Sequence, residues 1–184
     1  MSSDPARAEF DAMPLEMLEE ASGELHRRLG NALRRLGEAR ADEDDETGMT
    51  PRWRVTALAS TLELAAHSLA AIGAGVPALP ERSDQAPLAI ASLMYATPDL
   101  GGLLARLEQD RRQLGSLARS LEARLQETHH TAFQFGTLRQ LLTEVAIAEP
   151  ARCAQSLEAH LAALELAELA AATGEDSELA EDSV

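Results

Sequence analysis

Two pairs of acidic and histidine residues have a spacing that suits metal ligation on a helix. Glu63 and His67 are one turn apart, so they share a helix face. Glu127 and His130 have the Glu-x-x-His spacing that carboxylate-bridged metal sites in helical bundles use twice, together with two further glutamates. Because the sequence contains this motif only once, we expect neither a metal ion nor another cofactor, and we keep a His/Glu metal-binding bundle as an alternative.

The single cysteine, Cys153, is a candidate nucleophile. A helix that begins at Pro150 would place the thiol in its first turn, where the helix N-terminus can lower a thiol pKa. A buried, unreactive thiol is the alternative. One cysteine cannot form an internal disulfide, so we expect a reducing cytoplasm. The sequence has no G-x-S-x-G motif and no Gly-rich loop after a strand, and we therefore expect a protein that is not an enzyme.

Three glycines recur every seven residues within a helical pattern, at Gly23, Gly30 and Gly37. A glycine inside a helix costs about 0.5–1 kcal/mol relative to alanine. Because small residues occur where two helices pack closely, we interpret these glycines as the place where the backbone of a neighbouring helix approaches. An exposed helix that merely tolerates glycine is the alternative.

The same segment carries a leucine seam and an arginine stripe. Leu29 and Leu36 fall on one heptad seam, and the arginine doublets lie away from it. The arginines could bind an acidic partner or a nucleic-acid phosphate, or they could pair with acidic neighbours on a solvated face. The candidate interaction residues are Gly23, Gly30, Gly37, Leu29, Leu36, Arg27, Arg28, Arg34 and Arg35.

The composition predicts helices and a soluble protein. Alanine and leucine supply 35 and 30 of the 184 residues, and aromatic residues are scarce. The formal charge of −15 and the absence of lysine disfavour binding to nucleic acid or anionic membranes. Polar residues interrupt the most apolar stretch, 55–79, and the first residues lack a signal-peptide pattern, so we expect a cytoplasmic location.

Proline marks the expected helix starts, because the first turn does not need its missing N–H. Helices are expected to begin at Pro14, Pro51, Pro98 and Pro150, with a further short helix over 86–96. Thr50 and Thr97 are suitable N-cap residues for the second and third of the main helices.

The segment 98–147 allows two interpretations. Leucine recurs every seven residues from Leu100 to Leu121, which would suit one long third helix. The stretch 129–136 mixes β-branched, aromatic and glycine residues, so we favour a break near it. In that case Thr131 would cap a shorter helix over 132–147.

These elements predict an all-α fold, a mostly antiparallel bundle of four or five helices with a possible long third helix. We expect a flexible N-terminus over 1–12, a single helical domain over 13–173, and a disordered acidic tail over 174–184.

Two segments resemble parts of a known family of DNA-binding proteins. Residues 49–60, MTPRWRVTALAS, with 62–69, LELAAHSL, resemble the helix that precedes the helix-turn-helix of MarR-type winged-helix regulators. Residues 97–108, TPDLGGLLARLE, are similar to the recognition helix of that family. The resemblance implies a helical DNA-binding transcriptional regulator, which is a second alternative. The sequence departs from the family in that no basic, β-branched hairpin is apparent after Leu107.

The function that we expect is non-enzymatic: an adaptor, chaperone or scaffold that binds a helical protein partner or itself. The scarcity of large side chains makes the core of one chain thin. A homo-oligomer would bury additional apolar area, so we expect self-association.

Overall fold

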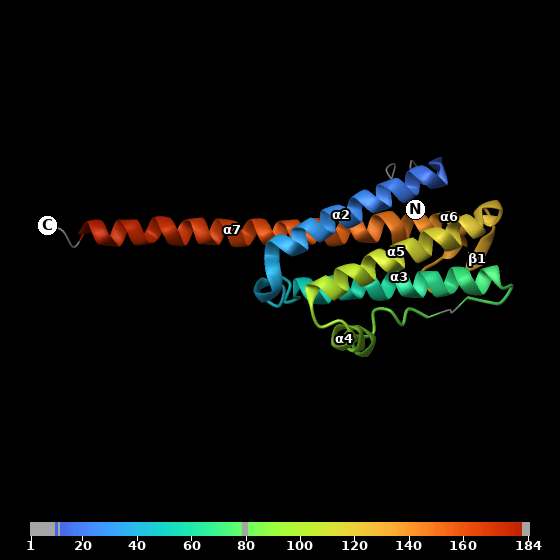
Figure 1. Cartoon of the computed structure of the whole chain (residues 1–184), viewed down its shortest axis with the longest axis horizontal. Helices are drawn as coiled ribbons and strands as arrows, with labels where there is room; N and C mark the ends of the chain where they lie inside the picture. The colour runs from blue at the N-terminus through green and yellow to red at the C-terminus, as the bar shows by residue number, and fades with distance from the viewer. Residues whose placement is uncertain (1–9, 11, 79–80, 182–184) are drawn as a thin grey trace.

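The computed structural model describes residues 10, 12–78 and 81–181, with side chains as far as 172. Figure 1 shows the helices as a bundle. This confirms the all-α prediction. The elements are α2 (Leu15–Arg40), α3 (Pro51–Gly73), α4 (Pro87–Ala96), α5 (Leu100–Ser120), a 3₁₀ turn η1 (Glu122–Arg124), β1 (Thr128–His130), β2 (Phe135–Thr137), α6 (Leu138–Thr143), a π-helical turn η2 (Glu144–Ala148) and α7 (Glu149–Glu181).

Four long helices form the bundle, and contacts between their side chains give the direction of each. The Arg28–Glu158 and Arg35–Glu165 ion pairs advance along both partners, so α2 and α7 run parallel. The Glu19–Arg119 pair and the hydrogen bond from the Leu100 N–H to Glu38 make α2 and α5 antiparallel. Helix α3 runs beside α5 in the same direction, and the connection between them is a long crossover that contains α4 (Figure 1).

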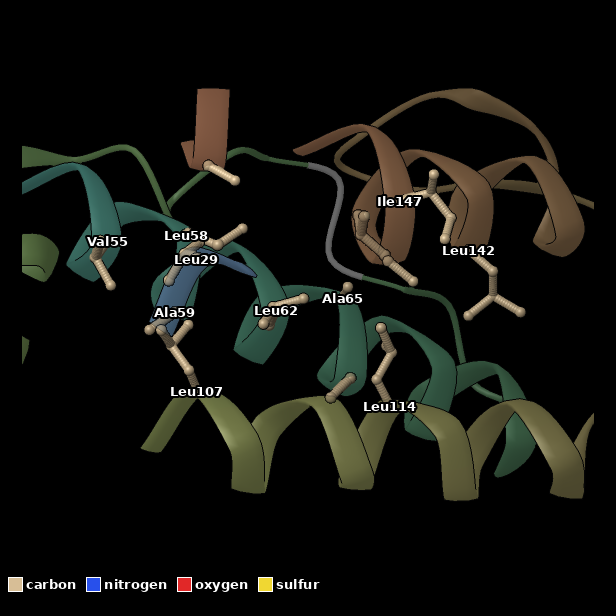
Figure 2. Packing of buried hydrophobic residues seen from close by; sticks show 14 of the residues in the cluster. Leu29, Val55, Leu58, Ala59, Leu62, Ala65, Leu107, Leu114, Leu142 and Ile147 are labelled. Carbon is tan, nitrogen blue, oxygen red and sulfur yellow. The ribbon is translucent and has the colours of Figure 1, made fainter. Parts of the chain in front are cut away.

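Leucine and alanine side chains from all four long helices fill the core. Figure 2 shows Leu29 of α2, Leu62 of α3 and Leu107 of α5 among these residues. The two seam leucines of α2 are both buried, with Leu29 at 0% and Leu36 at 4% exposure. The heptad interpretation therefore identified the inner face of α2 correctly.

Two of the expected helix starts are confirmed, and the third lies slightly later. Helix α2 begins directly after Pro14, and α3 has Pro51 in its first turn, with Thr50 accepting a hydrogen bond from the Trp53 N–H. Helix α5 is capped by Asp99 rather than Thr97, because the Asp99 carboxylate accepts the Gly102 N–H at 2.7 Å.

The favoured interpretation, a break within 98–147, is confirmed, and the other possibility, one long third helix, is not. Helix α5 ends at Ser120, and β1 and β2 form an antiparallel hairpin in which His129 pairs with Gly136. The next helix begins after Thr137, which forms a reciprocal capping box with Gln140, so Thr131 is not the cap. The β-branched and aromatic residues that suggested a break thus form strands.

Pro150 does not begin a helix as predicted. The backbone is helical without a break from α6 through η2 into α7. A proline inside an α-helix removes one hydrogen bond and its ring clashes with the carbonyl four residues earlier, which is Ala146. The π-helical turn that contains Ala146 gives the local widening that accommodates the ring.

The predicted domain boundaries at the two ends are only partly covered by the structure. The flexible N-terminus predicted for 1–12 lies almost wholly outside the described residues. Helix α7 continues to Glu181, within the stretch for which we predicted a disordered tail, and 182–184 lie outside the described residues.

Among the described residues, one helix is long and apolar enough to cross a membrane. This helix is α3, and 67% of its most apolar window is buried inside the bundle, as in the core helix of a soluble protein. Helices α4 and α5 are long and apolar enough only when they are taken together, and the chain bends by 113° between them.

Candidate functional site: the groove between α2 and α5

Two of the three glycines that recur every seven residues in α2, Gly23 and Gly30, face helix α5. A Cβ atom built on Gly30 would meet the Leu104 side chain at 3.5 Å, and one built on Gly23 would meet Arg111 at 3.8 Å. These contacts are with side chains and not with a backbone, so the predicted close approach of two backbones is wrong in that respect. Leu104 and Arg111 are themselves seven residues apart, and α5 thus faces the glycines in register.

Gly37 has a different role from the other two glycines. Its φ is +73°, which interrupts the helical backbone near the end of α2, and a Cβ atom there would meet nothing within 4 Å. We predicted that a second helix would pack against Gly37, and this was wrong. The left-handed conformation accounts for glycine at this position.

The small residues leave two cavities along the line where α2 meets α5, and we call the two together the α2–α5 groove. The larger cavity, about 410 Å³, is lined by residues that include Gly23, Gly30 and Leu104. The smaller cavity, about 250 Å³, lies toward the start of α2 beside Ser22. Arg111 and Arg112 line both cavities.

Buried polar atoms without partners line the groove. The Nδ1 of His26 lies 2.9 Å from the Ser22 carbonyl oxygen, whereas Nε2 is buried with no hydrogen-bond partner among the described residues. Burial lowers the pKa of His26, and the nearby Arg111 guanidinium lowers it further. The Ser22 hydroxyl is likewise buried without a partner in the described part of the chain. The sequence alone does not distinguish His26 from the other histidines, because nothing local shows that it faces α5.

Arginine side chains surround the larger cavity. Arg111 and Arg112 share the Glu108 carboxylate, which lowers the pKa of Glu108 to about 2. Arg34 donates to the Asn31 side chain at 2.8 Å, and Arg27 pairs with Glu24. The lining of this cavity contains Arg27, Arg34, Arg111, Arg112 and a single carboxylate, Glu108.

The other two predicted interaction arginines bind within the chain. Arg28 pairs with Glu158 at 2.5 Å and Arg35 with Glu165 at 2.6 Å, both on α7. Arg40 adds a third pair with Glu168. For Arg28 and Arg35 the structure agrees with the alternative in which the arginines pair with acidic side chains. These acidic side chains belong to α7, a helix distant in sequence.

The candidate metal ligands do not meet. Glu63 pairs with Arg106, and His67 is exposed. Glu127 accepts hydrogen bonds from Arg124 and from His129 rather than joining His130. Within the described ranges, no group of three or more His, Cys, Asp or Glu side chains could hold a metal ion.

The thiol of Cys153 packs against the core rather than lying at a helix start. Burial raises its pKa to about 12. The thiol is therefore protonated at neutral pH, and a protonated thiol is a poor nucleophile. This agrees with the alternative of an unreactive cysteine.

The segment that is similar to a recognition helix is part of the bundle. Helices α4 and α5 meet at 113°, within the range of helix-turn-helix pairs, and the β1–β2 hairpin follows α5, although we expected no hairpin. Leu103 and Leu107 of α5 are, however, buried in the core. DNA binding stays a prediction.

Comparisons of the chain with protein-family models, with curated proteins and with solved structures find no match.

Proposed function

We propose that this is a non-enzymatic helical interaction protein, an adaptor, chaperone or scaffold, that binds a second copy or a helical partner through the outer part of α7. In Figure 1 helix α7 extends well beyond the other helices. Two leucines on this part are largely exposed, Leu166 at 68% and Leu169 at 64%. We call residues 162–172 the projecting segment. Its first part still contacts α2 through the Arg35–Glu165 and Arg40–Glu168 ion pairs, and Leu164 packs against the core. As part of the same proposal, we assign the protein to the cytoplasm.

A projecting apolar helix is a reason to expect a partner. An isolated helix of this length is marginal in water, because most helical stability in proteins comes from packing an apolar face. Burying a leucine side chain contributes about 1.5–3 kcal/mol, so covering Leu166 and Leu169 would stabilise the helix and a complex together.

Analytical ultracentrifugation of the purified chain tests the proposal. We expect the wild-type protein to associate and the Leu166→Gln/Leu169→Gln variant to be monomeric. Leu88→Gln is the matched control, because Leu88 lies on α4 and is 79% exposed. This control should associate as the wild type does.

A heterotypic partner is tested by the same variants. A partner captured from the native host should bind wild-type protein and Leu88→Gln, and should be lost with the double variant. A wild-type protein that stays monomeric at every concentration, and that captures no partner dependent on Leu166 and Leu169, would show that the proposal is wrong.

A further inference from the structure

We propose that the larger cavity of the α2–α5 groove binds a phosphate group carried by a small organic molecule. The proposal is independent of the function assigned to α7. It follows from three properties of the cavity: its charge, the histidine in its lining whose buried Nε2 has no partner among the described residues, and its volume.

The charge of the cavity is opposite to that of the whole chain. Its lining contains four arginines and one glutamate, and Glu24 pairs with Arg27, which together give 4 − 2 = +2 with the histidine neutral, in a protein whose formal charge is −15. Guanidinium groups bind phosphate oxygens through paired, charge-assisted hydrogen bonds. Arg34 has only an amide partner, Asn31, among the described hydrogen bonds and ion pairs. It is therefore the guanidinium most available to a ligand.

His26 narrows the choice of anion. The Ser22 carbonyl oxygen can only accept, so the hydrogen lies on Nδ1 and the neutral ring presents an acceptor at Nε2. A group that satisfies both His26 and the arginines must donate one hydrogen bond and also carry negative oxygens. The monoanion of a phosphate ester does both, whereas carboxylate and sulfate ions have no proton to donate at neutral pH.

The volume and the apolar lining residues of the cavity leave room for an organic group. A cavity of about 410 Å³ is within the range of small-molecule sites and is larger than a phosphate group needs. Gly23 and Gly30 supply no side chains, and Leu104 and Leu107 provide an apolar surface. The small residues of α2 thus make space for a ligand that combines a phosphate with an apolar or planar body.

Isothermal titration calorimetry at pH 6 tests this, because a phosphate monoester there is about half monoanion. The probes are adenosine monophosphate, adenosine, inorganic phosphate and sulfate. We expect adenosine monophosphate to bind most tightly, inorganic phosphate to bind more tightly than sulfate, and adenosine to bind least. The difference in affinity between phosphate and sulfate tests the hydrogen bond from the ligand to His26.

Two variants localise the binding. Arg34→Gln should weaken the binding of adenosine monophosphate by about tenfold or more. Arg35→Gln is the matched control, since Arg35 is the next residue but pairs with Glu165 outside the groove, and its affinity should stay within about twofold of the wild type. Both side chains are exposed, so both variants should fold. Equal affinities for phosphate and sulfate, an unchanged affinity in Arg34→Gln, or no binding of either phosphate probe would overturn the proposal.

Discussion

Asp110 is a carboxylate on the inner face of α5, where 3% of the residue is exposed. Its Oδ1 lies 3.4 Å from the Arg106 Nε, and Oδ2 has no hydrogen-bond partner in the described part of the chain. Burial, and after it the Glu63 carboxylate, raise the pKa of Asp110 to about 6, against the opposing effect of Arg106. The folded protein therefore holds an ionised side chain in its core at neutral pH.

A raised pKa in the folded state makes protonation of Asp110 stabilising. Its favourable contribution is complete below about pH 4 and is lost as the pH rises through about 6. Asp110→Asn removes the charge, so we expect the variant to exceed the wild type in free energy of unfolding at pH 7–8, by of the order of 3 kcal/mol. The difference should shrink as the pH falls to 4. Urea denaturation between pH 4 and 8 measures it.

Glu122→Gln is the control for Asp110, because Glu122 is exposed on the turn after α5. Its effect on the free energy of unfolding should be small at every pH. A difference between Asp110→Asn and the wild type that does not change with pH would contradict the assignment of the titration to Asp110.

Two glycines of α2 should respond in opposite directions to the same substitution. Gly30 has a helical backbone and an added Cβ would make only ordinary contacts, so Gly30→Ala should raise the free energy of unfolding by about 0.5–1 kcal/mol. Gly37 has a φ of +73°, so Gly37→Ala should lower it by about 1 kcal/mol. Urea denaturation of both variants checks the pair. Changes of the same sign would mean that backbone conformation does not decide the effect.

At the scale of elements, Arg52 joins the ends of three helices. The guanidinium of Arg52 in α3 donates to Asp42 and to Glu38, each at 2.7 Å, and to the Pro98 carbonyl at 3.0 Å just before α5. Glu38 in turn accepts the Leu100 N–H. A single planar side chain thereby sets the positions of α2, α3 and α5 at one end of the bundle.

Arg52→Lys keeps the charge but loses the planar set of N–H groups with which the guanidinium donates to three acceptors. We expect it to lower the free energy of unfolding by about 1–3 kcal/mol, the range of lost hydrogen bonds to charged groups. Arg27→Lys is the control, because Arg27 forms one exposed pair with Glu24 and such pairs contribute little. Denaturation curves in which the two variants lose equal stability would contradict the role of Arg52.

At the scale of the whole molecule, stability is expected to decrease along α7. The inner part of the helix packs on α2 and contributes Leu157 and Leu161 to the core. The projecting segment contributes no buried side chain and is joined to α2 by two largely exposed ion pairs, and such regions open with low free energy.

Hydrogen–deuterium exchange measured by mass spectrometry tests this gradient. In dilute protein, the amides of the projecting segment should exchange much faster than those in the middle of α3. Under conditions in which the chain associates, exchange in the projecting segment should slow while α3 is unaffected. Uniform protection along α7 in the monomer would show that the segment needs no partner.

The parts of the fold that the sequence predicted correctly depend on neighbours within a few residues. Pro14 and Thr50 mark helix starts through local backbone geometry, and the seam with Leu29 and Leu36 follows from helical periodicity. The candidate site was less predictable. Gly23 and Gly30 were singled out for small size, but their role depends on Leu104 and Arg111 of another helix.

The sequence by itself determined that the chain is an α-helical bundle, that Leu29 and Leu36 of α2 face inward, and that the chain is acidic. Tertiary structure decided that Arg28 and Arg35 bind α7, that His26 lies in a cationic groove, and that α7 continues past its neighbours. The physical reason is the separation along the sequence over which each kind of interaction acts. Propensity, capping and periodicity act between residues a few positions apart, whereas a cavity or an ion pair between helices depends on side chains that only folding brings together.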